Sequence, residues 1–154
     1  MSRILAVDWG ERRVGLAISD PQGIIATGLD TLQVTSLDQA VSRVAEVART
    51  QGAERIVVGL PLLMSGERGE AAEAAQAFAT AIGRRTSLPV DTYDERLTSA
   101  LSERRLREVG VRTGHARARV DQGAAVALLE SYLQRMIHRA VDARRDPPSD
   151  DPGT

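Results

Sequence analysis

The stretch LAVDWGERRVGLAISD, residues 5–20, begins with an apolar run that ends on an acid, Asp8, and continues past Gly10 into a second apolar run. Two such runs separated by turn residues predict adjacent antiparallel strands. A buried carboxylate is costly unless its charge is offset, so a chain keeps one at the end of a core strand only for a reason. Two explanations stay open for Asp8: a turn-forming role before Gly10, or a role in a functional site.

The residues on either side extend this hairpin into a three-stranded meander. The expected strands are residues 3–9, 14–19 and 24–34. A helix with one buried face follows, because Ser36 and Gln39 form a capping-box pattern and Gly52 is a typical helix stop. The apolar residues at helical spacing in this segment are Leu37, Val41, Val44, Ala45 and Ala48.

Strands and helices alternate through the rest of the chain. The expected elements are a buried strand at 55–60 ended by Pro61, an alanine-rich helix at 67–82 ended by Gly83, a strand at 89–95, a helix from a Thr98 cap to 109, an irregular basic loop at 110–119 and a last helix at 120–138. This order predicts an α/β fold with a mixed five-stranded sheet, βββαβαβα, flanked by helices.

Composition indicates one globular domain. The chain has 154 residues, of which 42% are hydrophobic and 27% charged, and we expect a single domain at 1–142 with a disordered, proline-rich and acidic tail at 143–154. It has no cysteine, which excludes disulfides, thiolate zinc sites and a thiol nucleophile. The N-terminal apolar run is too short for a signal peptide, and no segment reaches the ~20 apolar residues of a membrane span. We expect a cytoplasmic protein without a membrane partner.

The charge distribution is more informative than the net charge. The formal net charge is -1, which argues against a protein that coats nucleic acid nonspecifically. All basic residues are arginine, however, and six of them cluster at Arg104, Arg105, Arg107, Arg112, Arg117 and Arg119. Arginine binds phosphate in a bidentate manner. The alternative for such a cluster is a solvated helix end followed by a linker.

Three acids occupy positions where apolar residues would be expected or where strands end. Asp8 ends the first strand, and Glu95 stands where the strand at 89–95 runs into a helix cap. Asp121 shares a helical stripe with Ala124, Ala125, Leu128 and Tyr132. Each has an ordinary alternative: a turn for Asp8, and favourable charge at a helix start for Glu95 and Asp121. If the three converge, their mutual repulsion requires shared protons or a hard cation, for which oxygen ligands indicate Mg²⁺ or Mn²⁺.

The sequence as a whole resembles a known family, the YqgF family, also called RuvX. The family's opening pattern is matched by Asp8, Gly10, Arg13, Gly15, Ala17, Ser19 and Asp20. The later stretches VVGLPL (57–62), DERLTSA (94–100) and VDQGAAVALLESYL (120–133) are similar to its other motifs in order and spacing. The sequence departs from the family after Pro61, where Leu63 replaces a polar amide and Ser65 an acid.

The resemblance implies an RNase H-like fold and a set of site residues. It implies that Asp8, Glu95 and Asp121 are catalytic and hold one or two divalent ions. A fourth ligand stays open among Asp20, Asp94 and His115. The arginines expected to contact nucleic acid are Arg13, Arg96, Arg112, Arg117 and Arg119. For Gly10, Gly15 and Gly59 we expect turns or close backbone approach, and for Trp9 a place in the core.

The implied function is a metal-dependent nuclease that leaves a 5′-phosphate. Family resemblance favours maturation of the 5′ end of precursor 16S ribosomal RNA, and the alternatives are cleavage of four-way DNA junctions and non-catalytic RNA binding. A junction enzyme needs two symmetric sites and hence a dimer, so both monomer and homodimer stay open. A kinase-like ATP site is disfavoured, because no second glycine-rich phosphate loop is present.

Overall fold

The computed structural model describes residues 3–98 and 114–145, with the backbone alone described at 114–122 and 145. Its elements are β1 (Arg3–Asp8), β2 (Arg13–Ser19), β3 (Ala26–Gln33), α1 (Leu37–Gln51), β4 (Ala53–Leu60), α2 (Glu70–Thr86), β5 (Val90–Asp94), the 3-10 turn η1 (Glu95–Leu97) and α4 (Gly114–Arg145). The strands form one sheet in the order β3-β2-β1-β4-β5. The expected mixed five-stranded sheet is confirmed.

The pairing of the strands follows from their connections. β1, β2 and β3 are antiparallel neighbours joined by short turns, whereas β4 and β5 run parallel to β1 and are reached through α1 and α2. Asp8 pairs with Gly15 of β2, and Val7 pairs with Val58 of β4. The carboxyl ends of β1, β4 and β5 therefore lie at one edge of the sheet.

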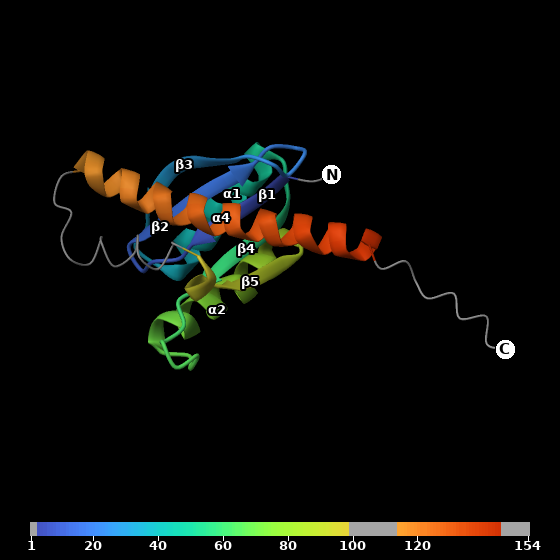
Figure 1. Ribbon diagram of the computed structural model, residues 1–154. Helices are drawn as coiled ribbons and strands as arrows, with labels where there is room; N and C mark the ends of the chain where they lie inside the picture. The colour runs from blue at the N-terminus through green and yellow to red at the C-terminus, as the bar shows by residue number, and fades with distance from the viewer. Residues whose placement is uncertain (1–2, 99–113, 146–154) are drawn as a thin grey trace.

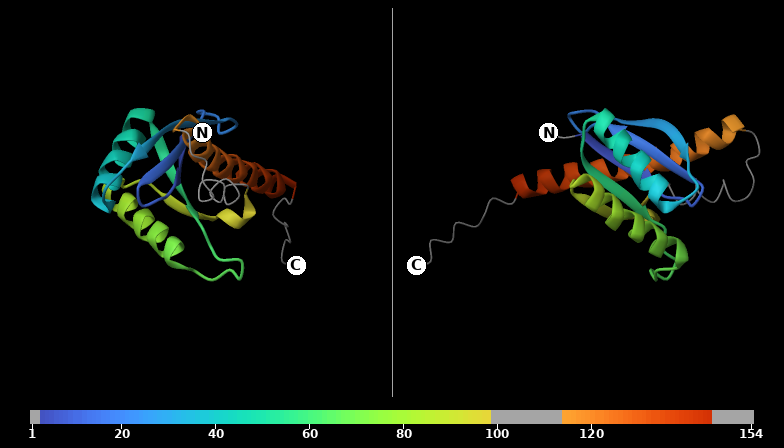
Figure 2. Two further views of the ribbon diagram at one scale, coloured as in Figure 1. Left: turned by 90° about the vertical axis from the view of Figure 1, so that its left-hand side faces the viewer. Right: turned by 180° about the vertical axis from the view of Figure 1, so that it is seen from behind.

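Helices cover both faces of the sheet. Helices α1 and α2 lie on one face and α4 crosses the other (Figure 2). Leu5 and Val7 belong to the core under α1 and α2, whereas Ile4 and Ala6 belong to the core under α4. Because successive side chains of a strand point to opposite faces, Asp8 faces the α4 side.

Helix α1 begins and ends as expected, and its expected apolar stripe packs on the core except at Leu37. Ser36 Oγ accepts a hydrogen bond from the Gln39 N–H at 3.1 Å, and Gly52 closes the helix in the left-handed region at φ 68°. The buried residues are Ala40, Val44 and Ala48, whereas Leu37 is 41% exposed. The expectation that Leu37 belongs to the buried face is wrong, because that face is shifted onto Ala40.

Helix α2 corrects two expected boundaries. It begins at Glu70 and not at 67, and it continues through Gly83 to Thr86, where Ser87 closes it at φ 59°. A Cβ at Gly83 would lie 3.3 Å from Val90 Cγ2. Gly83 is thus not a helix stop but the point where α2 packs closely against the start of β5.

Helix α4 is longer than expected at both ends. It begins at Gly114, so the expectation of an irregular loop is wrong for residues 114–119, and it continues past 138 to Arg145. Alanine and arginine are good helix formers, which explains why this basic segment is helical. Figure 1 shows that α4 crosses the sheet and projects beyond it. No helix in the described ranges is long and apolar enough to span a membrane.

Candidate active site

Two of the three acids meet at the carboxyl edge of the parallel strands. Asp8 is the last residue of β1, Glu95 is the first residue of η1 after β5, and both are fully buried at 0% exposure. η1 holds Glu95 in place, because the N–H and hydroxyl of Thr98 both donate to the Glu95 carbonyl, at 3.1 and 3.0 Å. The helix expected from Thr98 to 109 otherwise lies outside the described residues.

Gly59 of β4 brings the Glu95 carboxyl group next to Asp8. β4 lies between β1 and β5, and Gly59 follows Val58, the register partner of Val7. A Cβ at Gly59 would overlap Oε1 of Glu95 and lie 3.0 Å from its Cγ. The Glu95 side chain therefore folds back over β4 onto the α4 face, beside the strand position that Asp8 occupies.

Glycine also stands on the other side of Asp8. Asp8 pairs with Gly15 of β2, which is buried. The acid is thus flanked by Gly15 on one strand and Gly59 on the other, and neither contributes a side chain to the surface around its carboxylate. The prediction that Gly59 permits a close approach is confirmed by its contact with Glu95.

Asp121, the third acid, lies in the third turn of α4, and its side chain lies outside the described residues. The helix-start alternative for it is wrong, because α4 begins at Gly114. Leu133 packs near Gly23 of the β2–β3 turn, so α4 runs antiparallel to β1 and residue 121 lies toward the edge that carries Asp8. Within the side chains that are described, no three histidines or acids form a metal-binding group.

Two of the three candidates for a fourth metal ligand, Asp20 and Asp94, already bind other groups of the chain. Asp20 lies at the opposite end of the sheet, where its Oδ1 accepts from the Ile24 and Ile25 N–H groups at 2.7 and 2.8 Å. Those hydrogen bonds lower the pKa of Asp20, chiefly the one from Ile25. Asp94 pairs with Arg96, and the side chain of His115 lies outside the described residues.

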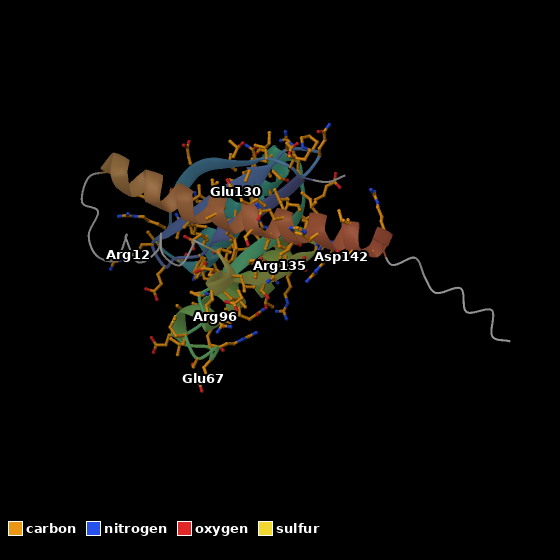
Figure 3. All side chains as sticks on the ribbon, viewed as in Figure 1. Arg12, Glu67, Arg96, Glu130, Arg135 and Asp142 are labelled. Atoms are coloured by element: carbon orange, nitrogen blue, oxygen red, sulfur yellow. The ribbon has the colours of Figure 1, made fainter. Side chains whose placement is uncertain are left out.

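Arg96 lies at the edge of the sheet that carries Asp8 and Glu95, but it is held by an acid. Its guanidinium Nη2 is 2.7 Å from Oδ2 of Asp94, and its Nε donates to both carboxylate oxygens. This hydrogen bonding is the main reason that the pKa of Asp94 is lowered. The guanidinium also lies against Gly66 in the loop after β4. Figure 3 labels Arg96 and, in the same loop, Glu67. Arg96 of η1 therefore lies beside that loop.

Of the remaining expected contacts to nucleic acid, Arg13 is the one whose side chain is described. It begins β2, two residues before Gly15, and therefore lies on the same face as Asp8. A cavity of about 610 Å³ at this end of the sheet is lined by Glu11, Arg12, Arg13, Gln33, Val34, Thr35 and Gln39. Arg112 and the side chains of Arg117 and Arg119 lie outside the described residues.

Trp9 and the loop after β4 complete the surroundings. The Trp9 ring stacks on Phe78 of α2 with centroids 4.8 Å apart, so its predicted place in the core is confirmed.

In the loop after β4, Leu63 and Met64 are 51% and 77% exposed, and Ser65 Oγ accepts from the Glu67 N–H at 3.3 Å. The two departures from the family pattern thus lie on an exposed loop that follows the carboxyl end of β4.

Comparison with solved structures identifies the fold. The chain superimposes on the Thermus thermophilus RuvC in complex with a Holliday junction substrate with a TM-score of 0.54 and 18% identity, covering 88% of this chain and 96% of that one. A Fowlpox virus resolvase bound to Holliday junction DNA gives a TM-score of 0.52 at 12% identity, covering 88% and 99%. The chain therefore has an RNase H-like fold.

Sequence comparison then identifies the family. A family model described as "RuvX: Holliday junction resolvase" matches residues 2–135. Relatives named "Putative pre-16S rRNA nuclease" are 42% identical over 146 residues in Chloroflexus aurantiacus (95% of this chain, 90% of the relative) and 40% identical over 136 residues in Mycobacterium tuberculosis (88% and 80%). The chain belongs to the RuvX family, whose members are hydrolases of phosphodiester bonds.

Proposed function

We propose that this protein is a divalent-metal-dependent nuclease that matures the 5′ end of precursor 16S ribosomal RNA. The observation that carries the proposal is the placement of two fully buried acids, Asp8 and Glu95, on one face of the sheet across Gly59. The names of relatives that are about 40% identical over most of the chain support the choice of RNA as substrate.

The donor set fits Mg²⁺ or Mn²⁺. Two carboxylates buried at neighbouring positions repel each other, and a hard cation with oxygen ligands removes that repulsion. We assign Asp8, Glu95 and Asp121 as its ligands. A divalent ion bound there would activate water and stabilise the leaving oxygen of a phosphodiester.

The acids of this chain would position the metal ion, and its arginines would bind the phosphates of the substrate. Asp8 is held by the β1 ladder and Glu95 by η1, so the backbone positions that carry both carboxylates are fixed before substrate arrives. Arg13 lies on the same face and is suited to bind a phosphate oxygen of the substrate. Arg117 and Arg119 belong to the N-terminal turns of α4, and together with Arg96 and Arg112 they are the other proposed contacts to the nucleic acid backbone.

The test compares acid variants on a labelled precursor 16S 5′-leader RNA with Mg²⁺ or Mn²⁺. Asp8→Asn and Asp121→Asn each remove one charged ligand, and we expect each to lower the cleavage rate by about 100-fold or more. Asp20→Asn is the matched control: it belongs to the same motif but lies at the other end of the sheet, and the amide oxygen still accepts the Ile24 and Ile25 N–H groups. This control is expected to cleave like the wild type.

Cleavage that persists without added metal, or that survives both acid substitutions, would overturn the proposal. RNA binding without any cleavage would favour the non-catalytic binding module. A four-way DNA junction belongs in the same experiment, because the family description and the two solved neighbours concern Holliday junctions. Paired symmetric nicks by a dimer would favour the resolvase over RNA maturation.

A further inference from the structure

A second, larger cavity lies at the β5 side of the sheet, between α2 and α4. Its volume is about 730 Å³. It is lined by Arg55, Gln76, Ala79, Thr80, Val90, Asp91, Thr92, Tyr93, Tyr132, Arg135, Met136 and Arg139. β5 is the last strand of the sheet described here, so the cavity runs along a strand edge and not across the face that holds Asp8.

The charge of this cavity is positive. Three arginines and one acid, Asp91, line it. The acid is already compensated, because Arg55 Nη1 lies 2.9 Å from its Oδ2 and the Tyr132 hydroxyl donates to the same oxygen. Arg135 and Arg139 form no ion pair with any acid in the described part of the chain. Two exposed cations are thus left to face the cavity.

These two arginines form a row along one wall. They are four residues apart on α4, so they lie on one helix face about 6 Å apart along its axis. The Arg135 guanidinium lies over the Tyr93 ring, 5.7 Å from its centroid, which orients it. Thr80 and Gln76 on α2 provide hydrogen-bonding groups on the opposite wall. A row of cations facing polar groups suits a chain of phosphates.

The cavity adjoins the active site through Tyr93. Tyr93 pairs with Gly59, the residue over which the Glu95 carboxyl group lies. The Tyr93 hydroxyl is hydrogen-bonded to Ser131 Oγ at 2.9 Å, which joins this strand to α4. From Tyr93 the cavity follows β5 back to Val90, about 10 Å along the strand. The cavity therefore ends two residues before Glu95, within reach of a substrate strand that extends beyond the acids.

We infer that this cavity, which we call the β5 cleft, binds the sugar-phosphate backbone of the substrate strand flanking the scissile bond. Arg135 and Arg139 would each contact a phosphate of that flank, while the acids act on the bond itself. The inference rests on the proposed nuclease function, since it concerns the same substrate. Because the contacts are to phosphates, the β5 cleft adds affinity without reading base sequence.

The test measures binding of labelled leader RNA by Arg135→Ala/Arg139→Ala over a series of salt concentrations, in an Asp8→Asn background that prevents cleavage. We expect about 10-fold weaker binding, and a plot of log affinity against log salt that is shallower by about 1.4 to 1.8 for two lost phosphate contacts. The matched control is Arg84→Ala/Arg144→Ala, which removes the same charge at exposed helix positions outside the β5 cleft. Its decrease in slope should be much smaller.

A second RNA, truncated close to the cleavage site, locates the contact. The β5-cleft variant should lose its defect on this short RNA, because the flank that the cleft binds is missing. Arg139→Ala alone keeps the Arg135–Tyr93 contact and should show half of the slope change, which separates binding from any packing effect. Equal binding by the β5-cleft variant and the control, or an equal defect on both RNAs, would overturn the inference. Cleavage by the wild type, measured in parallel, tests the nuclease proposal independently.

Discussion

At the residue scale, Gly59 constrains the site as strongly as the acids do. Its hydrogen atom leaves the space into which the Glu95 carboxyl group folds, and any side chain there would occupy the same volume. Gly15 pairs with Asp8 on the other side, so the acid has glycine at both neighbouring strand positions. The acids approach each other because the positions that flank Asp8 on β2 and β4 are glycines, which carry no side chain.

Gly59→Ala is expected to lower cleavage by about 100-fold while the protein stays folded, because the new methyl group displaces the Glu95 carboxyl group by about an ångström. The measurement is the single-turnover cleavage rate together with thermal unfolding. Gly52→Ala is the contrasting variant: Gly52 has φ 68° and no atom within 4 Å of its added Cβ. It should destabilise the protein by about 1 kcal/mol through the end of α1 and leave the cleavage rate unchanged. A fully active Gly59→Ala protein would contradict this role.

At the element scale, the packing of α2 against β5 depends on one glycine inside the helix. Gly83 allows the helix to approach Val90 at the start of β5, and the helix continues one further turn to Ser87. Glycine inside a helix is unfavourable by about 1 kcal/mol relative to alanine. The close packing of α2 on β5 offsets this unfavourable helix propensity. β5 in turn leads directly into Glu95.

A double-mutant cycle separates these two effects. Gly83→Ala alone gains helix propensity but places a Cβ 3.3 Å from Val90 Cγ2, so its effect on stability should be near zero or unfavourable. In a Val90→Ala background the same substitution should stabilise the protein by about 1 kcal/mol. Urea unfolding of the four proteins measures the coupling. Identical effects of Gly83→Ala in both backgrounds would show that the contact with Val90 is not the constraint.

At the scale of the whole molecule, α4 is attached to the sheet by polar contacts as well as by its apolar stripe. Tyr132 is buried against the sheet, and its hydroxyl donates to Asp91 of β5. Burial, and then this hydrogen bond to a carboxylate, raise the pKa of Tyr132 to about 12. The helix that carries Asp121 is thereby tied to the strand that leads to Glu95, so one contact positions two elements of the proposed active site.

The hydrogen bond between Tyr132 and Asp91 should make the free energy of unfolding depend on pH in the alkaline range. The pKa of Tyr132 is raised from 10.0 to about 12, so the protonated hydroxyl is favoured in the folded state. Its contribution is complete below pH 10 and is lost as the pH rises toward 12. Tyr132→Phe should cost about 1 kcal/mol at neutral pH and should flatten the alkaline decline, as measured by urea unfolding across that range. An equally steep decline in the variant would contradict the assignment.

Much of the fold and part of the site follow from local signals. Apolar runs, turn residues and the Ser36 and Gly52 caps predict the strands and α1, because each signal acts through a few neighbouring residues. The same patterns place Asp8 and Glu95 at strand ends. They do not show that Asp94 and Arg96 form a pair or that Asp20 caps a hairpin, since both depend on which groups are free to bond in the folded chain.

The sequence by itself determined the order of the elements, the faces of the strands and the acids to examine. Only the tertiary structure decided that α2 continues through Gly83, that Gly59 receives the Glu95 side chain, and that a cleft lined by Arg135 and Arg139 lies beside β5. The physical reason is that these features depend on contacts between residues far apart in the chain. Helix propensity, strand alternation and capping act over a few residues and carry no information about which distant side chain will fill a given space.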